Sequence, residues 1–88
     1  MAHQADPEIR RGLTQARGHI DSILSMLTDN RSCIDLAQQL QAVENTVRKV
    51  KRALVEDHMQ HCIADAANSG AMSGDEALRQ FKALTKYL

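Results

Sequence analysis

The chain has 88 residues, enough for one small domain but few for a self-sufficient core, so we expect oligomerisation to bury further apolar surface. Its 11 basic and 11 acidic side chains balance, which argues against indiscriminate binding to nucleic acid. Two cysteines without a signal peptide or a long apolar segment favour a reduced cytoplasmic protein over a disulfide-rich secreted protein or a membrane protein.

Helix-forming residues dominate the chain, and no alternating β-branched run occurs, which predicts an all-α protein. Residues 1–6 have no periodicity and are expected to form a flexible arm that carries His3. From Pro7, apolar side chains recur at intervals of four and three as far as Leu27, which predicts a first helix over 7–28. The short segment 29–31 predicts a tight turn, so the first two helices should form an antiparallel hairpin.

A long second helix is predicted over 32–67, with Ser32 as its N-cap and Asp35 three residues later. Its apolar side chains also alternate at intervals of four and three: Leu36, Leu40, Val43, Val47, Val50 and Leu54. This heptad-like pattern is typical of a helix that packs along another helix.

After a stop at 68–70, Ser73 and Glu76 form a second capping-box pattern, which predicts a short third helix over 73–87. Residues 7–88 should therefore make a single all-helical domain of three helices.

Both cysteines lie on the second helix. Cys33 is in its first turn, whereas His58 and Cys62 stand four residues apart near its other end. Twenty-five residues separate Cys33 from His58, a rise of about 37 Å along a helix, so one chain cannot bring all three to one ion. A second chain lying antiparallel, with a two-fold axis near Thr46 and Val47, would bring Cys33 of each chain to His58 and Cys62 of the other.

Two thiolates and one imidazole are the donors that a thiophilic ion such as Cu(I) prefers. The alternative is that both cysteines are small buried hydrophobic residues and His58 is a surface residue. His61 lies on a different face and is interpreted as structural, or as a residue that supports the ligands.

Basic residues gather on the first two helices and suit contacts with phosphates, although charged helix faces are often only solvated. The candidates are Arg10, Arg11, Arg17, Arg48, Lys49, Lys51 and Arg52. The sequence has no phosphate-binding loop and no arrangement of nucleophile and base, so we expect neither an enzyme nor a small-molecule substrate.

The run Arg17-Gly18-His19-Ile20-Asp21, together with Cys33, His58 and Cys62, resembles the copper-sensitive operon repressor (CsoR) family. This family also includes nickel/cobalt, formaldehyde and persulfide sensors. The resemblance implies an antiparallel homodimer of four-helix-bundle type that pairs into a tetramer. It also implies binding to operator DNA and its release when the inducer binds between subunits.

By this resemblance, Cys33 of one protomer and His58 with Cys62 of its neighbour would hold Cu(I), and Glu76 would support the ligands from the third helix. Arg17 and the other basic side chains would contact the DNA backbone. Ni(II) or Co(II) sensing is the alternative, with His3 as an additional ligand. A metal buffer or carrier without a DNA role is the alternative from another class.

Overall fold

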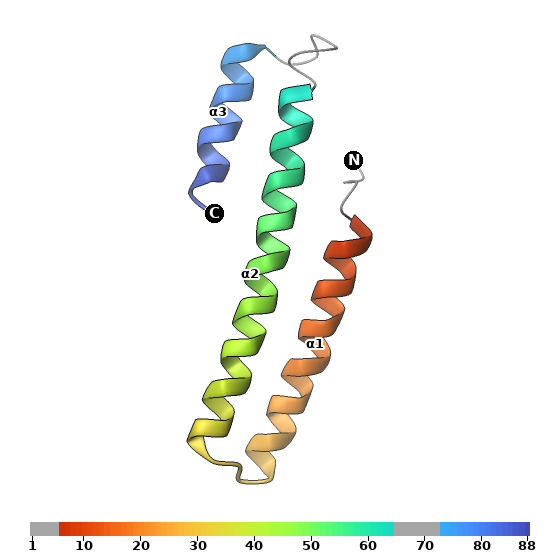
Figure 1. Cartoon of the computed structure of the whole chain (residues 1–88), viewed down its shortest axis with the longest axis vertical. Coiled ribbons are helices and arrows are strands. Elements are labelled where there is room, and N and C mark those ends of the chain that lie inside the picture. Colours follow the sequence, from red (N-terminus) through yellow and green to blue (C-terminus); the bar gives the residue numbers. More distant parts are fainter. Residues whose placement is uncertain (1–5, 65–72) are drawn as a thin grey trace. The chain divides into compact units, whose positions relative to one another are not determined.

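The computed structural model describes residues 6–64 and 73–88, apart from the side chain of Cys62, and the regular secondary structure of this part is entirely helical. The helices are α1 (Asp6–Thr28), α2 (Cys33–Ala64) and α3 (Gly74–Thr85) (Figure 1). The predicted all-α fold is confirmed. Residues 65–67, expected to end the second helix, and the expected stop at 68–70 lie outside the described residues.

The chain divides into two compact units, and α2 runs through both. One unit is Pro7–Val50, and the other is formed mainly by Lys51–Leu88. Each unit has a small core of its own. The buried residues Ala16 and Ile23 belong to the first, and Val55 and Met59 belong to the second.

In the first unit, α1 and the first half of α2 form the predicted antiparallel hairpin (Figure 1). His19 of α1 meets Gln39 of α2, with its Nε2 2.6 Å from the amide Oε1. Farther from the turn, Gly12 lies directly against a methyl group of Val50. These two contacts set the register of the hairpin.

Backbone hydrogen bonds close the turn between α1 and α2. Arg31 N–H donates to the Met26 carbonyl at 3.1 Å, and Asn30 N–H donates to the Leu27 carbonyl at 3.3 Å. Asn30 has φ 55°, the left-handed conformation that commonly ends a helix. The short connection predicted from the sequence is therefore an ordered turn that ends α1.

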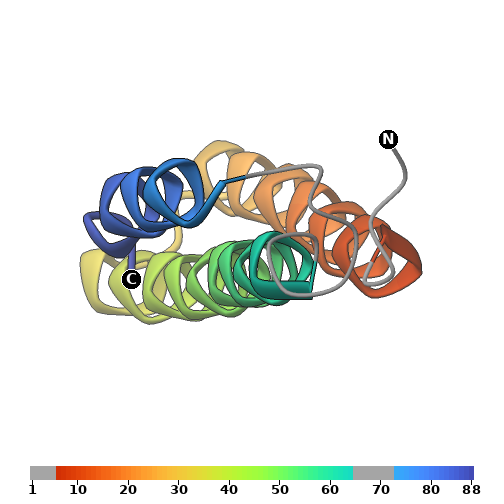
Figure 2. The same ribbon diagram turned by 90° about the horizontal axis from the view of Figure 1, so that it is seen from above.

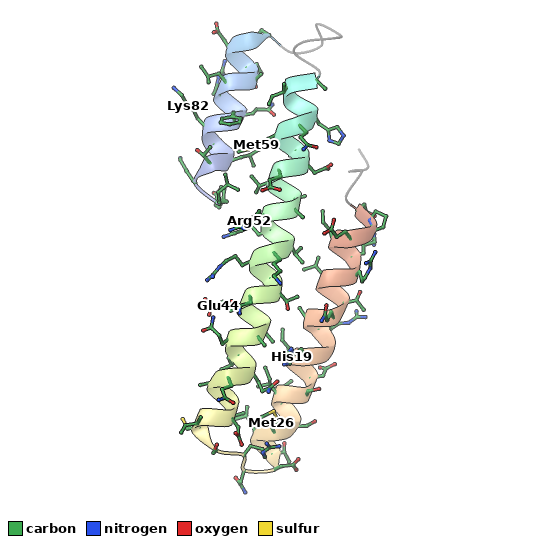
Figure 3. All side chains as sticks on the ribbon, viewed as in Figure 1. His19, Met26, Glu44, Arg52, Met59 and Lys82 are labelled. Carbon is green, nitrogen blue, oxygen red and sulfur yellow. The ribbon has the colours of Figure 1, made fainter. Side chains whose placement is uncertain are left out.

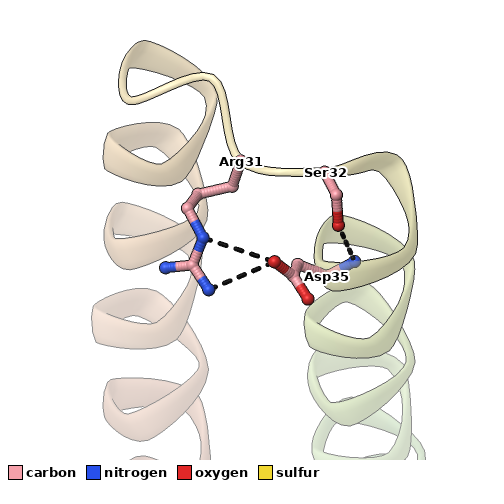
Figure 4. Close-up of polar contacts among 3 residues, drawn as sticks. All are labelled: Arg31, Ser32 and Asp35. Atoms are coloured by element: carbon pink, nitrogen blue, oxygen red, sulfur yellow. Dashed lines mark hydrogen bonds and ion pairs between the residues drawn. The ribbon is translucent and has the colours of Figure 1, made fainter.

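The start of α2 is fixed by its predicted cap (Figure 4). The Asp35 N–H donates to Ser32 Oγ at 3.1 Å. Arg31 donates through Nε and Nη2 to Asp35 Oδ2, at 3.3 and 3.2 Å. Because Ser32 caps the helix from outside, α2 begins at Cys33.

In the second unit, α3 lies beside the last turns of α2 (Figures 1 and 2). The predicted cap of α3 is present, since the Glu76 N–H donates to Ser73 Oγ at 3.1 Å. The helix ends at Thr85, where Tyr87 N–H bonds to the Leu84 carbonyl at 3.0 Å and tightens the final turn.

Replacement of Gly12 by Ala should destabilise the hairpin, because the new methyl group would collide with Val50. Such overpacking typically costs about 1–3 kcal/mol, of which the better helix propensity of Ala returns up to about 1 kcal/mol. Urea unfolding at fixed protein concentration would measure the loss.

Two variants serve as controls for this substitution. Gly18→Ala should be neutral or stabilising, because nothing lies within 4 Å of the added methyl group. Val50→Ala in the Gly12→Ala background should recover part of the loss. If Gly12→Ala and Gly18→Ala behave alike, the close approach of the two helices is wrong.

Candidate metal site and basic surface

Cys33 is the first residue of α2, and its thiol is free and exposed. It follows the cap formed by Ser32, and the carboxylate of Asp35 is held by Arg31. Within the single chain, Cys33 is therefore not a buried hydrophobic residue. Its thiol is open to a metal ion or to another chain.

His58 lies near the other end of α2 and is half-buried against α3. Its Nε2 is 3.2 Å from Oε1 of Gln80. With the amide oxygen as acceptor, Nε2 carries the proton, which leaves the lone pair on Nδ1. The ring is therefore oriented by α3 in the way that protein histidines are commonly held for metal binding.

The hydrogen bond from α3 to His58 does not come from the expected carboxylate. Glu76 forms an ion pair with Arg79 at 3.1 Å, and Gln80, one turn further along α3, meets His58. Glu76 was expected in this role because the resemblance to the CsoR family matches it to a supporting carboxylate in the third helix. The sequence does contain a signal for Gln80. It lies one turn before Leu84, on the apolar face of the predicted third helix, which is the face expected to pack against another helix.

Cys62 and His3 are the other two candidate ligands. The backbone of Cys62 belongs to α2, but its side chain is not described, and His3 lies outside the described residues. Within residues 6–64 and 73–88, no three His, Cys, Asp or Glu side chains gather to hold a metal ion.

His61 has a partner that was not anticipated. Its Nδ1 is 3.6 Å from Oδ2 of Asp57, whose side chain is only 8% exposed. Asp57 and His61 are four residues apart on α2, a spacing at which side chains on a helix meet. His61 was expected on a different face from the ligands, as a structural or supporting residue, but its carboxylate partner was not expected.

A row of exposed aliphatic side chains follows Cys33 along α2 at intervals of seven residues. Leu40, Val47 and Leu54 are 54%, 43% and 39% exposed. An apolar groove between α1 and α2 adjoins this row, lined by Ile20, Ile23, Leu24, Leu27, Leu36 and Leu40. Aliphatic surface of this extent commonly marks an interaction site.

All seven basic side chains proposed from the sequence are exposed. Arg48 forms an ion pair with Glu44 at 2.9 Å, one turn earlier on α2. Arg52 follows Arg48 by four residues in α2, the spacing of neighbours on a helix surface. The structure thus leaves these basic side chains exposed and pairs Arg48 with an acidic residue.

A family model described as "Metal-sensitive transcriptional repressor" matches residues 5–87. The chain belongs to this family of repressors. It is therefore a metal-sensing regulator of transcription and not an enzyme, and the family suggested by the sequence is confirmed.

Individual relatives of this repressor differ in the metal they sense. It is 35% identical over 83 residues to the copper-sensing transcriptional repressor CsoR of Bacillus subtilis, covering 90% of this chain and 80% of that protein. Two solved structures are also similar. The nickel-responsive regulator InrS has a TM-score of 0.85 at 27% identity, over 100% of this chain and 98% of InrS. The Cu(I) complex of CsoR from Geobacillus thermodenitrificans has a TM-score of 0.80 at 31% identity, over 98% and 88%.

None of the described helices of the repressor is long and apolar enough to cross a membrane.

Proposed function

We propose that this repressor senses Cu(I) in the cytoplasm and releases operator DNA when the ion binds. The proposed ligands are Cys33 of one chain and His58 with Cys62 of a second chain. The donor set fits the ion, since two thiolates and an imidazole suit a soft monovalent metal at low coordination number. When bound, Cu(I) would supply a covalent link between the two chains.

The length of α2 is the observation that carries this proposal. The helix is continuous from Cys33 to Ala64, so in regular geometry His58 stands about 37 Å from Cys33 along the axis. At about 100° per residue, His58 and Cys62 lie within roughly 20° on either side of the direction of Cys33. The three residues lie on one face of α2, but Cys33 is at one end and His58 and Cys62 are near the other. A single ion can therefore contact all three residue types only if an antiparallel second chain supplies some of them.

The exposed aliphatic row agrees with this arrangement. Leu40, Val47 and Leu54 lie between the proposed ligands and leave apolar surface that a second α2 would cover. Cys33 at one end of the row and His58 at the other would then meet their counterparts at the two ends of the dimer. Two such dimers would pair into a tetramer.

The proposed coupling between metal and DNA is thermodynamic linkage. Cys33, held by the cap of α2, and His58, held by Gln80, would clamp the two long helices together at both ends. If DNA favours a different arrangement of the helices, each partner weakens binding of the other by the same free energy. The exposed basic residues of α1 and α2 would contact the phosphates.

The test is operator binding with and without Cu(I) under anaerobic conditions, measured by fluorescence anisotropy. Wild type should release DNA on adding one Cu(I) per chain. The Cys33→Ala variant should bind the operator with unchanged affinity and keep it when Cu(I) is added. Normal release from Cys33→Ala would show that the proposed site is wrong.

Ni(II) or Co(II) sensing is the second candidate, and the similarity to InrS favours it. In that case His3 would be an additional ligand. Titration of the reduced protein with Cu(I) and Ni(II) against competing chelators, with His3→Ala alongside wild type, separates the two. Weak Cu(I) binding together with a Ni(II) site that fails without His3 would establish the nickel alternative.

Replacement of Glu44 by Gln should strengthen operator binding, because Glu44 neutralises Arg48 within the proposed DNA-binding surface. Removing one negative charge beside phosphates should raise affinity about 3- to 10-fold at low salt, and less at high salt. Asp75→Asn, which removes the same charge from the exposed start of α3, is the matched control and should change little. Equal effects of the two variants would argue against a DNA surface around Arg48.

A further inference from the structure

We infer that the side-chain amides of Gln41 and Asn45, paired on an exposed face of α2, recognise an adenine in the major groove of the operator. The inference rests on the proposed function, because these residues lie beside basic side chains that we propose to contact DNA phosphates. It goes further by assigning them the selection of sequence, which contacts with phosphates do not supply directly.

Gln41 and Asn45 are both exposed, and they lie on the side of α2 that faces away from α1. Within the hairpin, α2 meets α1 through Gln39, which contacts His19, and through Val50, which contacts a glycine. At about 100° per residue, both amides lie at least about 120° around the helix from these two contacts. This face of α2 is therefore open to a partner from outside the hairpin.

A hydrogen bond joins the two amides, since Gln41 Nε2 donates to Asn45 Oδ1 at 3.2 Å. Each amide has an oxygen acceptor and a nitrogen donor, so the pair still offers the Gln41 oxygen as an acceptor and the Asn45 nitrogen as a donor. If both amides were turned over, the pair would again offer one acceptor and one donor. The bond also restricts both side chains before DNA binds, which lowers the entropic cost of binding.

One acceptor beside one donor is complementary to the major-groove edge of adenine. Adenine presents a donor at N6 and an acceptor at N7, and this is the edge that glutamine and asparagine commonly recognise. Guanine presents two acceptors there, thymine presents an acceptor and a methyl group, and cytosine presents a donor alone. Of the four bases, adenine alone satisfies both groups of the amide pair.

The neighbouring charges favour DNA as the partner of this face. Arg48 and Lys49 follow Asn45 by three and four residues, the spacings of neighbours on a helix surface, and both are exposed. Glu44, which also lies nearby, is paired with Arg48 at 2.9 Å. Cations that hold phosphates here would bring the amides to a base edge, because the major groove is about 12 Å wide and admits an α-helix.

The experiment selects bound duplexes from a pool with a randomised central segment, using wild type, Gln41→Ala and Asn45→Ala without added metal. We expect wild type to enrich a site with a required adenine and both variants to accept any base at that position. Measured by fluorescence anisotropy on duplexes with single base changes, discrimination should fall about 5- to 100-fold there and less than about 2-fold elsewhere. The double variant should lose no more than either single variant, because the pair acts as one unit.

Gln60→Ala is the matched control for these variants. It removes an exposed amide from α2 about four turns further along the helix than Asn45. Because this amide lies outside the proposed pair, the variant should select the same site as wild type with the same discrimination.

Three results would overturn the inference. If both variants select the wild-type site with unchanged discrimination, the amide pair only stabilises α2. If they weaken binding to all duplexes equally, the pair assists the approach of DNA but does not select its sequence. If wild type itself enriches no sequence, the proposed operator binding fails as well, whereas the first two results leave it standing.

Discussion

Mixing chains that carry Cys33→Ala with chains that carry His58→Ala should restore high-affinity Cu(I) binding that neither variant shows alone. Each proposed site takes Cys33 from one chain and His58 with Cys62 from the other. In a mixed dimer, one site therefore combines two substitutions and the other has none. With random exchange of subunits, about one intact site should form for every four chains.

The measurement is Cu(I) bound per chain in competition with a chelator, before and after the two variants are unfolded together and refolded. A mixture of His58→Ala with Cys62→Ala is the matched control, because both substitutions affect the same half of the site and no exchange can repair it. Absence of recovery in the first mixture, with subunit exchange confirmed by a mass-tagged chain, would exclude an inter-chain site.

Charge reversal at Lys49 and Arg52 together should reduce operator affinity by more than about 100-fold at moderate salt, because two attractive charges per chain become repulsive. The dependence of affinity on salt should also weaken, by roughly 0.9 in the logarithmic slope for each lost phosphate contact. Fluorescence anisotropy at a series of salt concentrations gives both quantities. Cu(I) affinity should be unchanged.

Lys82→Glu is the control for this prediction, since Lys82 is an exposed base on α3 (Figure 3). It changes the net charge without touching the proposed surface and should reduce operator affinity only slightly. If Lys82→Glu lowers operator affinity by the same factor per charge, the affinity depends on the net charge of the protein and not on a DNA-binding surface around Arg52. If the double variant still binds DNA normally, the basic residues of α2 are not the contact.

Local sequence signals predicted the helices well because their causes are local. The hydroxyls of Ser32 and Ser73 cap α2 and α3 as expected, since a cap depends on residues only three apart. The turn before Cys33 was predicted for the same reason. Described helix ends differ by one or two residues: α1 begins at Asp6, which was expected in the flexible arm, and α3 ends at Thr85, where the final turn tightens.

Contacts between helices were harder to predict. Gln80 and not Glu76 meets His58, because the partner depends on the register of α3 against α2, which the pattern within α3 does not specify. The contact of Gly12 with Val50 depends on hairpin packing, which helix periodicity does not specify. Asp57 with His61 could have been found, because Asp-x-x-x-His on a helix is a local pattern.

The turn that ends at Cys33 has a consequence for the entropy of metal binding. Asn30 and Arg31 are held by hydrogen bonds to the end of α1, and Arg31 also binds Asp35 at the start of α2. The backbone at the thiol is thus already ordered in the free protein and has little conformational freedom to lose. Preorganisation of this kind raises affinity by lowering the cost of binding. Lengthening the turn with flexible residues should therefore weaken metal binding even with every ligand in place.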